Sequence, residues 1–469
     1  MKFSLPHSLA FSLVAFGFAG CAIGPNYQRP VVAAPAFKEA GTWQPAEPAE
    51  YLPRGKWWEG YGDPVLNGLE DRVEISSNTL RIAEAQYQQV MAAVTSAYSG
   101  LYPTVNGTGS AFRNRTAAKG TAAGEIQNSF GAGLAASWEL DLWGTVRRGL
   151  EAGRATADAS RADLESVRLS LHAALAQTYF SLRVADTQQR LYDRTIAAYA
   201  RFLQMTKNRY AAGVATRADE ATAEAQLKTA QAQAIDLSLT RTQLEHAIAV
   251  LLGQPPATFS LAPADLTVRP PVAPEILSSE QLERRPDIAG AERRLAAASA
   301  GIGIAQGGYF PVISLTGSAG YQGSSWNNLF SAPNEVWSLG ASALAPLFNA
   351  GKVRAQVASA RAVYEESLGA YRQTVLTAFQ EVEDNLATAN YLAREAAVQE
   401  EAVAASRRAA SISLNQYKAG TVSYLDVITA QSAQLSTERT AAQLLGRRLN
   451  ASVMLLKAAG GDWRAPGKF

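Results

Sequence analysis

Cysteine and histidine are both scarce in this chain of 469 residues. The single cysteine, Cys21, cannot form a disulfide within the chain, so stability must come from packing or from assembly. The three histidines, His7, His172 and His246, lie far apart in the sequence. Since metal sites usually combine several closely spaced ligands, the sequence predicts no metal and no other cofactor.

Neither a strong charge imbalance nor a long apolar helix is present. The net charge is +2 at pH 7, which gives no electrostatic reason to expect a nucleic-acid partner. A transmembrane helix needs about 18 or more apolar residues in a row, and no such run occurs beyond residue 20. We therefore expect no nucleic acid and no helical membrane span.

An enzymatic function is not expected either. His172 and His246 both fall in long helical stretches, which leaves no plausible Ser-His-Asp set. The glycines of "GIGIAQG", 301–307, lie in an Ala-rich helical stretch, whereas a nucleotide-binding loop follows a strand. The sequence thus predicts no catalytic residue and no enzyme.

The N-terminal stretch "GFAGCAIGPNY" contains the cysteine. A lysine and an apolar run of roughly ten residues precede it, which is the length of a signal-peptide core. The small residues Ala19 and Gly20 stand directly before Cys21 and resemble a bacterial lipobox, with Phe18 in place of the usual leucine. This predicts a signal peptide over 1–20 and an acylated Cys21, anchored by ~0.8 kcal/mol per buried CH₂. The alternative is an ordinary signal peptide with an incidental cysteine.

The rest of the chain contains an internal repeat. "NRYAAGVATRAD" begins at Asn208, and "NQYKAGTVSYLD" begins about 207 residues later at Asn415. A period of this length indicates a duplicated domain rather than a solenoid unit. The predicted segments are 21–62, a lipidated N-terminal extended segment; 63–253, the first repeat; 254–286, a connecting segment; 287–459, the second repeat; and 460–469, a C-terminal tail.

Each repeat is predicted to contain two short strands, at about 103–142 and about 310–347. Polar and apolar residues alternate over about ten residues, which is typical of a membrane β-strand. The linking loops, 115–127 and 322–335, are polar, and aromatic residues lie near the strand ends as in an interfacial girdle. A soluble β-sandwich is the alternative. Four strands are too few for a sandwich of this size or to close a barrel, so several chains would have to share one barrel.

Very long helices are predicted to follow the strands, at 145–210 and 352–417. About 65 residues at 1.5 Å each would reach ~100 Å. The apolar stripe of the second helix repeats every eleven residues: Val353, Val357, Ala360, Tyr364, Leu368, Tyr371, Val375, Phe379, Val382 and Leu386. This period is close to 3.6 residues per turn and favours nearly straight helices over a two-stranded coiled-coil spacer. Return helices are predicted at 215–253 and 422–459.

A tight turn joins each long helix to its return helix. Two matched sets of residues define these turns: Gly213, Thr216 and Asp219 in the first repeat, and Gly420, Ser423 and Asp426 in the second. Glycine fits a left-handed position after a helix, and a Ser or Thr can cap the next helix together with an acidic residue three positions on. This structural interpretation accounts for the turns without invoking a function.

Three segments carry a resemblance to a known family. They are 57–80 (WWEGYGDPVLNGLEDRVEISSNTL), 247–256 (AIAVLLGQPP) and 284–321 (RRPDIAGAERRLAAASAGIGIAQGGYFPVISLTGSAGY). They resemble outer membrane efflux proteins, the TolC-like outer membrane factor family, in its NodT/OprM-type lipoprotein branch. The resemblance implies a mostly α fold with a membrane β-barrel part. In this fold, three chains close one barrel of twelve strands, four from each chain, above a long periplasmic α-helical barrel.

The family resemblance also implies a function. Such a homotrimer is a passive exit duct in the outer membrane, in contact with outer membrane lipid, and it extends into the periplasm. It passes small molecules such as drugs from an inner-membrane pump, of RND type in this branch, and a periplasmic adaptor protein to the exterior. Two alternatives stay open: the outer membrane component of type I protein secretion, and a structural helical lipoprotein. The paired amphipathic strands count against the second alternative.

The same resemblance assigns roles to the helical turns. The implied periplasmic gate consists of Asp219, Tyr417, Leu425 and Asp426. Three copies would form carboxylate rings, and Tyr417 is a candidate hydrogen-bond partner of Asp219. A helix-start carboxylate exposed to solvent is the alternative role for Asp426. The implied adaptor-contacting tips are Ala212, Gly213, Val214, Ala215 and Thr216, and Ala419, Gly420, Thr421, Val422 and Ser423.

Overall fold

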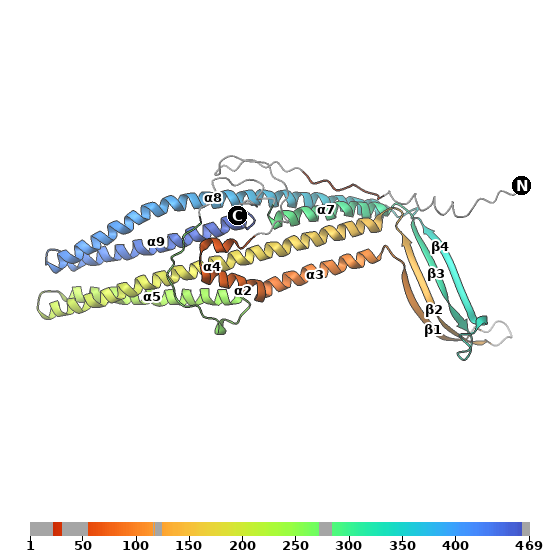
Figure 1. Ribbon diagram of the computed structural model, residues 1–469, viewed down its shortest axis with the longest axis horizontal. Coiled ribbons are helices and arrows are strands. Elements are labelled where there is room, and N and C mark those ends of the chain that lie inside the picture. Colours follow the sequence, from red (N-terminus) through yellow and green to blue (C-terminus); the bar gives the residue numbers. More distant parts are fainter. Residues whose placement is uncertain (1–21, 31–54, 116, 118–123, 272–283, 462–469) are drawn as a thin grey trace. The chain divides into compact units, whose positions relative to one another are not determined.

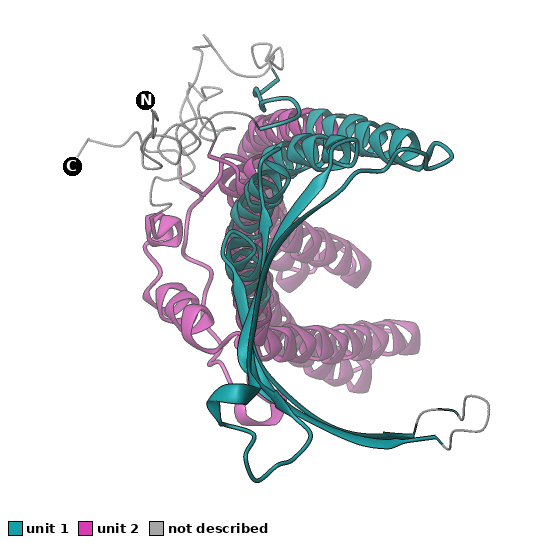
Figure 2. Ribbon diagram, turned by 90° about the vertical axis from the view of Figure 1, so that its right-hand side faces the viewer, with its two compact units in different colours: residues 1–31, 86–161, 290–372 teal, residues 32–85, 162–289, 373–469 magenta. Residues whose placement is uncertain are grey.

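The computed structural model describes residues 22–30, 55–115, 117, 124–271 and 284–461. The predicted signal peptide, Cys21 and most of the predicted tail lie outside these residues. The chain divides into two compact units, each assembled from three separate stretches (Figure 2). Unit 1 comprises 1–31, 86–161 and 290–372, and unit 2 comprises 32–85, 162–289 and 373–469. Both predicted repeats therefore contribute residues to both units.

Most of the described chain is helical (Figure 1). The α-helices are α2 (Pro64–Ser76), α3 (Asn78–Ser99), α4 (Thr145–Ala211), α5 (Arg217–Leu251), α7 (Pro286–Gly307), α8 (Lys352–Lys418) and α9 (Tyr424–Ala458). Short 3-10 helices are η1 (Trp57–Tyr61), η2 (Pro256–Thr258) and η3 (Ala332–Asn334). The two long helices, α4 and α8, each contain 67 residues and begin at the residues where the sequence predicts them.

Unit 1 contains one antiparallel sheet of four strands in sequential order (Figure 1). The strands are β1 (Thr104–Arg115), β2 (Ile126–Leu140), β3 (Val312–Gly323) and β4 (Glu335–Leu344). The central pair β2 and β3 joins the two repeats, and Gly133 lies opposite Gly320 in its register. A Cβ atom on Gly320 would meet the Gly133 backbone at 2.6 Å, so this close approach requires glycine.

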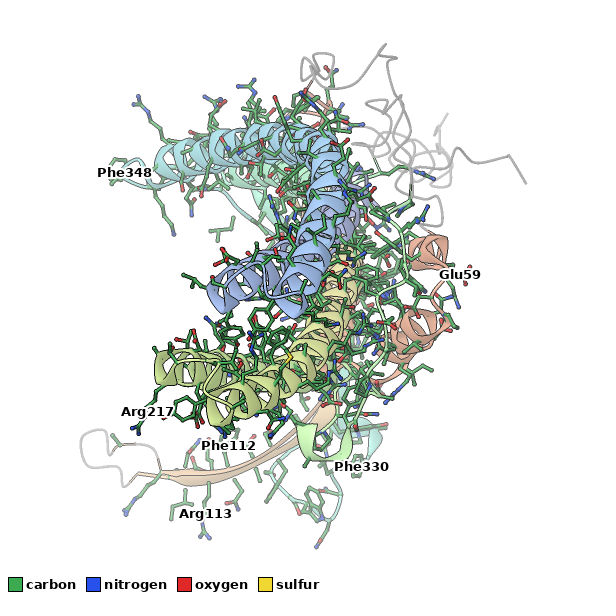
Figure 3. All side chains as sticks on the ribbon, turned by 90° about the vertical axis from the view of Figure 1, so that its left-hand side faces the viewer. Glu59, Phe112, Arg113, Arg217, Phe330 and Phe348 are labelled. Carbon is green, nitrogen blue, oxygen red and sulfur yellow. The ribbon has the colours of Figure 1, made fainter. Side chains whose placement is uncertain are left out.

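The sheet has no buried residue on either face. Every residue of β1 and β4 is exposed, and the residues of β2 and β3 are exposed or half-buried. Neighbouring side chains still alternate between the faces, and Phe112 and Arg113 leave β1 on opposite sides (Figure 3). A sheet of this kind has no hydrophobic core of its own within one chain.

The N-terminal residues 22–27 pack within unit 1. The buried Arg148 donates hydrogen bonds to the carbonyl of Ile23 at 3.1 Å, the carbonyl of Gly24 at 3.3 Å and the side chain of Asn26 at 2.9 Å. The Tyr27 hydroxyl donates to Glu292 at 2.6 Å. Because these bonds use backbone carbonyls as well as side chains, they hold the segment in one path.

Unit 2 contains a large apolar core around the middle of α4. Its buried apolar residues there form one broad face of the helix: Leu171, Ala173, Leu175, Ala176, Tyr179, Phe180 and Leu182. A helix with so broad an apolar face packs against several other elements. One of these is α2, whose N-cap Asp63 accepts from Val65 and Leu66 and also from the Tyr179 hydroxyl, at 2.6 Å.

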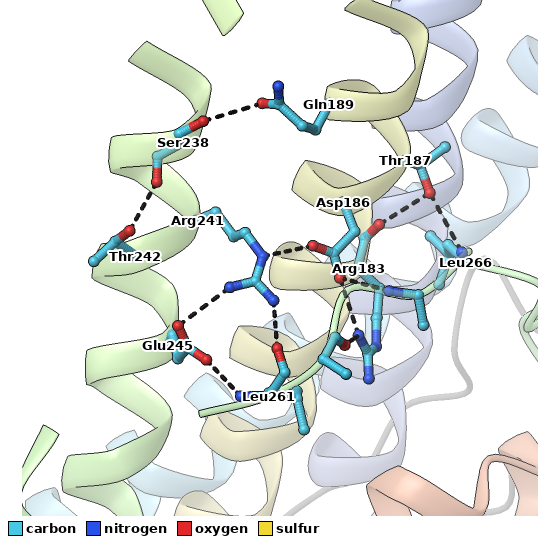
Figure 4. Close-up of polar contacts among 12 residues, drawn as sticks. Arg183, Asp186, Thr187, Gln189, Ser238, Arg241, Thr242, Glu245, Leu261 and Leu266 are labelled. Carbon is cyan, nitrogen blue, oxygen red and sulfur yellow. Dashed lines mark hydrogen bonds and ion pairs between the residues drawn. The ribbon is translucent and has the colours of Figure 1, made fainter. Parts of the chain in front are cut away.

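A buried ionic cluster fastens the connecting segment to α4 and α5 (Figure 4). Asp186 is 2% exposed and pairs with Arg183 at 2.9 Å and with Arg241 at 2.7 Å. Both arginines also donate to backbone carbonyls, those of Ala262 and Leu261. Each charge has partners on several sides, which offsets the cost of its burial. The segment between the repeats is thereby held against unit 2.

The predicted apolar stripe of α8 faces inward. The buried members are Val353, Val357, Tyr371, Val375, Val382 and Leu386. In the described residues, no helix is both long enough and apolar enough to cross a membrane. Within the same described ranges, no group of His, Cys, Asp and Glu is placed to hold a metal ion.

Candidate functional site

The two helical turns lie in unit 2 and have nearly the same backbone. Gly213 has φ +74° and Gly420 has φ +78°, which is the left-handed region that favours glycine. After the first long helix, Val214 N–H donates to the Arg209 carbonyl at 2.8 Å. After the second, Thr421 N–H donates to the Gln416 carbonyl at 3.0 Å. These bonds satisfy the last carbonyls of α4 and α8.

Both return helices begin with a capping box. The Asp219 N–H donates to Thr216 Oγ1 at 3.1 Å, while the Asp219 carboxylate accepts from the Thr216 N–H at 2.9 Å. In the second repeat, Asp426 N–H donates to Ser423 Oγ at 3.4 Å and its carboxylate accepts from Ser423 N–H at 2.9 Å. The hydrogen bonds from Ser423 hold the pKa of Asp426 below its usual range. The local sequence alone explains this geometry.

The capping boxes occupy the two carboxylates of the predicted gate. The hydrogen-bond partner of the Asp219 carboxylate in this chain is Thr216, through both N–H and hydroxyl groups. The described residues of one chain contain no hydrogen bond between Asp219 and Tyr417, and both cap contacts of Asp219 use Oδ2. A role for Asp219 and Asp426 in rings of three chains stays a prediction.

Tyr417 lies instead in a buried aromatic cluster. It is 5% exposed, and its ring lies 5.8 Å from that of Phe202 and 6.0 Å from that of Tyr424. The Arg209 guanidinium lies 4.7 Å from the centre of the Tyr417 ring, a cation–π geometry. Ala223, Val427 and Ile428 complete the core. We name Phe202, Tyr417 and Tyr424 the aromatic cluster; it joins the end of α4 to the turn between α8 and α9.

The first repeat has no counterpart of this cluster. The residue equivalent to Tyr417 is Tyr210, which is 44% exposed. The position equivalent to Tyr424 is occupied by Arg217, which lies exposed at the start of α5 (Figure 3). Ala409 stands where Phe202 would repeat. An aromatic cluster therefore packs against the second turn and not against the first.

Apolar side chains project from both tips. Leu425 is 66% exposed and Val214 is 65% exposed. The remaining predicted tip residues are exposed, except for Ala215 and Val422, which are half-buried. The structure thus leaves both tips accessible in one chain and places Leu425 beside Asp426 at the start of α9.

Sequence reasoning found Tyr417 and missed its partners, Phe202, Arg209 and Tyr424. Tyr424 directly follows the cap residue Ser423, so its aromatic character was a usable signal. Phe202 and Arg209 lie more than 200 residues from Tyr417 in sequence. Their contact depends on how the two repeats pack, and no local pattern reports it.

Comparisons with known proteins extend this description. A family model described as outer membrane efflux protein matches residues 70–254 and 277–461, one match for each repeat. The pyoverdine export outer membrane protein OpmQ of Pseudomonas aeruginosa is 32% identical over 451 residues, covering 92% of this chain and 94% of the relative. The toluene efflux pump outer membrane protein TtgI of Pseudomonas putida is 33% identical over 484 residues, covering 99% of each.

A solved structure has the same fold. The outer-membrane channel OprN superposes with a TM-score of 0.85 at 31% sequence identity, covering 94% of this chain and 100% of that chain. The similarity therefore spans the sheet and the helices together rather than one motif. The predicted resemblance and the internal duplication are both confirmed. The chain belongs to the outer membrane efflux protein family.

Proposed function

We propose that three copies of this chain form a passive exit duct that completes a tripartite efflux system. The observation that carries this proposal is the sheet, which has no buried residue on either face and two free edges, β1 and β4. Exposed strands of 12 and 10 residues invite pairing with another chain. Pairing β4 of one chain with β1 of the next would close a barrel and remove every edge.

The partners follow from this assembly. The relatives named above are outer membrane proteins of export and efflux systems, for pyoverdine and for toluene. A duct has no energy source of its own, so an inner-membrane pump, of RND type, and a periplasmic adaptor supply drive and cargo. The cargo is small molecules chosen by the pump. The exposed tips, Ala212–Thr216 and Ala419–Ser423, are the surface offered to the adaptor.

The tip also contains the gate in this proposal. Leu425 and Asp426 begin α9 and are exposed in one chain, so three copies would bring apolar and acidic rings together at the narrow end. The aromatic cluster supports the gate from behind, because it fixes α9 against α4. Opening by a movement of α8 and α9 relative to α4 then breaks the contacts of Tyr417 and Tyr424 with Phe202.

The lipid anchor on Cys21 is a further part of the proposal. Residue 22 directly follows Cys21, and residues 22–27 are held by Arg148 and Glu292. Acyl chains on Cys21 would therefore start from a fixed point of unit 1. We expect Cys21→Ser to abolish incorporation of radioactive palmitate while trimers still assemble, at a reduced level, since the barrel itself embeds the protein. Complete loss of the trimer would show that the anchor is essential for assembly.

The oligomer itself is the direct test. The full mature chain, purified in detergent, is expected to run as a trimer in light scattering corrected for detergent and to form conducting pores in planar bilayers. A stable monomer in several detergents, with no pore at high protein density, would contradict the duct and favour a structural lipoprotein.

A further inference from the structure

A buried histidine in unit 2 lies between two carboxylates. His172, on α4, is 3% exposed. Its Nδ1 lies 2.6 Å from Glu70 Oε2 and its Nε2 lies 2.8 Å from Glu74 Oε1, both on α2. The Glu70 side chain is fully buried, whereas the Glu74 side chain is 37% exposed. We name Glu70, His172 and Glu74 the histidine clamp; it lies about 40 residues before the first helical turn along α4.

The distances fix the minimum number of protons in the clamp. Each of the two short contacts needs one hydrogen atom between nitrogen and oxygen. A neutral imidazole carries one N–H, and two ionised carboxylates carry none. With only that proton, a nitrogen lone pair would face a carboxylate lone pair within 2.8 Å. The clamp must therefore hold at least two protons, one more than the separate groups hold in water above neutral pH.

The residues around the histidine clamp favour its protonated state, and further charged groups lie beside it. The Trp58 ring of η1 stacks on the imidazole with centroids 4.4 Å apart at 21°, a geometry that favours a cation. Arg168, on α4, pairs with Glu74 at 3.2 Å and also with Glu165. From α2, the exposed Asp71 pairs with Lys56 at 2.7 Å. Glu70 Oε1 has no hydrogen-bond partner although it is buried.

We propose that the histidine clamp is a proton-dependent fastener, which holds η1 and α2 on α4 when it contains two protons and releases them as protons are removed. Loss of a proton leaves a nitrogen of the buried imidazole facing a carboxylate oxygen with no hydrogen atom between the two acceptors, which is costly. The N-terminal part of unit 2 thereby responds to the pH of the surrounding compartment. The inference stands on the geometry of one chain and does not depend on the proposed duct.

The pKa shifts give the pH range. Burial opposes the charge of His172, but the hydrogen bonds that it donates to Glu70 and Glu74 raise its pKa from 6.5 to about 9. Burial raises the pKa of Glu70 from 4.5 to about 7, although His172 opposes the rise. Both raised values mean that the folded state binds more protons, so the docking of α2 weakens as pH rises. The hydrogen bond with His172 lowers the pKa of Glu74 below its ordinary value of 4.5. Glu74 therefore weakens the docking of α2 only as the pH falls below that value.

Hydrogen exchange of the full mature chain, read by mass spectrometry between pH 5 and 9, tests the proposal. Exchange rates are divided by those of unstructured peptides. The protection of α2 is then compared with that of residues 424–428 in α9, of which Tyr424, Val427 and Ile428 are buried at the aromatic cluster and have no part in the clamp. Release of one proton predicts that α2 loses protection by up to about tenfold per pH unit, relative to α9, between about pH 6.5 and pH 9, the ordinary and the raised pKa of His172. Equal pH dependence of α2 and α9 would overturn the clamp.

Two variants sharpen the test. In Glu70→Gln, the amide donates to a neutral imidazole, which still donates to Glu74, so both hydrogen bonds survive without the second proton. This variant is expected to hold α2 with no pH dependence. Asp71→Asn removes the same charge one residue away and should keep the wild-type slope. If Glu70→Gln retains that slope, the clamp does not control docking; if it fails to fold, the wild-type profile alone decides.

Discussion

The two helical turns of this protein have nearly the same backbone and very different surroundings. Both contain a glycine with positive φ and a capping box three residues wide. Tyr417 nevertheless lies buried against Phe202 and Tyr424, whereas the equivalent Tyr210 is exposed. Gene duplication has thus preserved what the local sequence dictates, while the packing around the two turns has diverged.

This difference assigns unequal roles to the turns. A turn that only caps helices can move without breaking tertiary contacts. The second turn is fixed to α4 by an aromatic cluster, so its displacement carries an energetic cost. We therefore place the mechanical resistance of the tip in the second turn. The predictions below test that asymmetry, beginning with the largest expected effect.

Removing the Tyr417 ring should have the strongest effect. Tyr417→Ala leaves a cavity beside Phe202 and deprives Arg209 of its ring, with an expected local destabilisation of about 3–5 kcal/mol, as for other large aromatic residues. Tyr210→Ala is the matched control and should change stability by about 0.5 kcal/mol or less, because that ring is exposed. Hydrogen exchange of residues 424–430 measures the effect of Tyr417→Ala, and that of the equivalent residues 217–223 measures the effect of Tyr210→Ala. Similar effects of the two variants would contradict the asymmetry.

The carboxylates at the turns provide the second test. Asp219→Ala combined with Asp426→Ala is expected to raise pore conductance in planar bilayers and vancomycin sensitivity in cells, because the carboxylates no longer accept the hydrogen bonds or ion pairs that latch neighbouring helices. Thr216→Ala combined with Ser423→Ala removes the same caps but keeps both carboxylates. If the two double variants behave alike, the effect is due to frayed helix starts and the gate does not depend on charge.

The smallest effect is expected for the cation–π contact. Arg209→Gln keeps length and polarity but removes the charge over the Tyr417 ring, at a cost of about 0.5–1 kcal/mol. Arg217→Gln is the exposed control on the first turn and should be neutral. Thermal shifts of the purified protein, compared at equal protein and detergent concentrations, distinguish the two. A larger shift for Arg217→Gln would reverse the proposed order of the turns.

Local patterns in the sequence predicted the elements well. The eleven-residue stripe from Val353 to Leu386 placed the buried side of α8, since helix periodicity is read directly from the chain. Gly213 and Gly420 marked the turns for an equally local reason. The break between α2 and α3 at Ser77 was not predicted, because both helices are apolar enough to read as one.

Local patterns could not predict contacts between segments that lie far apart in the sequence. His172 was read as one isolated histidine on a long helix, yet it meets two carboxylates roughly 100 residues earlier in the chain. Asp186 on α4 and Arg241 on α5 likewise form an ion pair between two helices, which no local pattern indicates. The Asp219 carboxylate forms a capping box that was visible in the sequence, and its predicted contact with Tyr417 stays a prediction.

Site-specific photo-crosslinking at the tips tests the central claim most directly. A photoreactive amino acid at Ala212 or Ala419 is irradiated in living cells, and the products are identified by mass spectrometry; the buried Ala176 serves as the negative control. The account predicts an adaptor at both tips and an inner-membrane pump in the same complex, and the class of that pump separates small-molecule efflux from protein secretion. Well-expressed trimers that capture only cell-wall or surface proteins would contradict the exit duct.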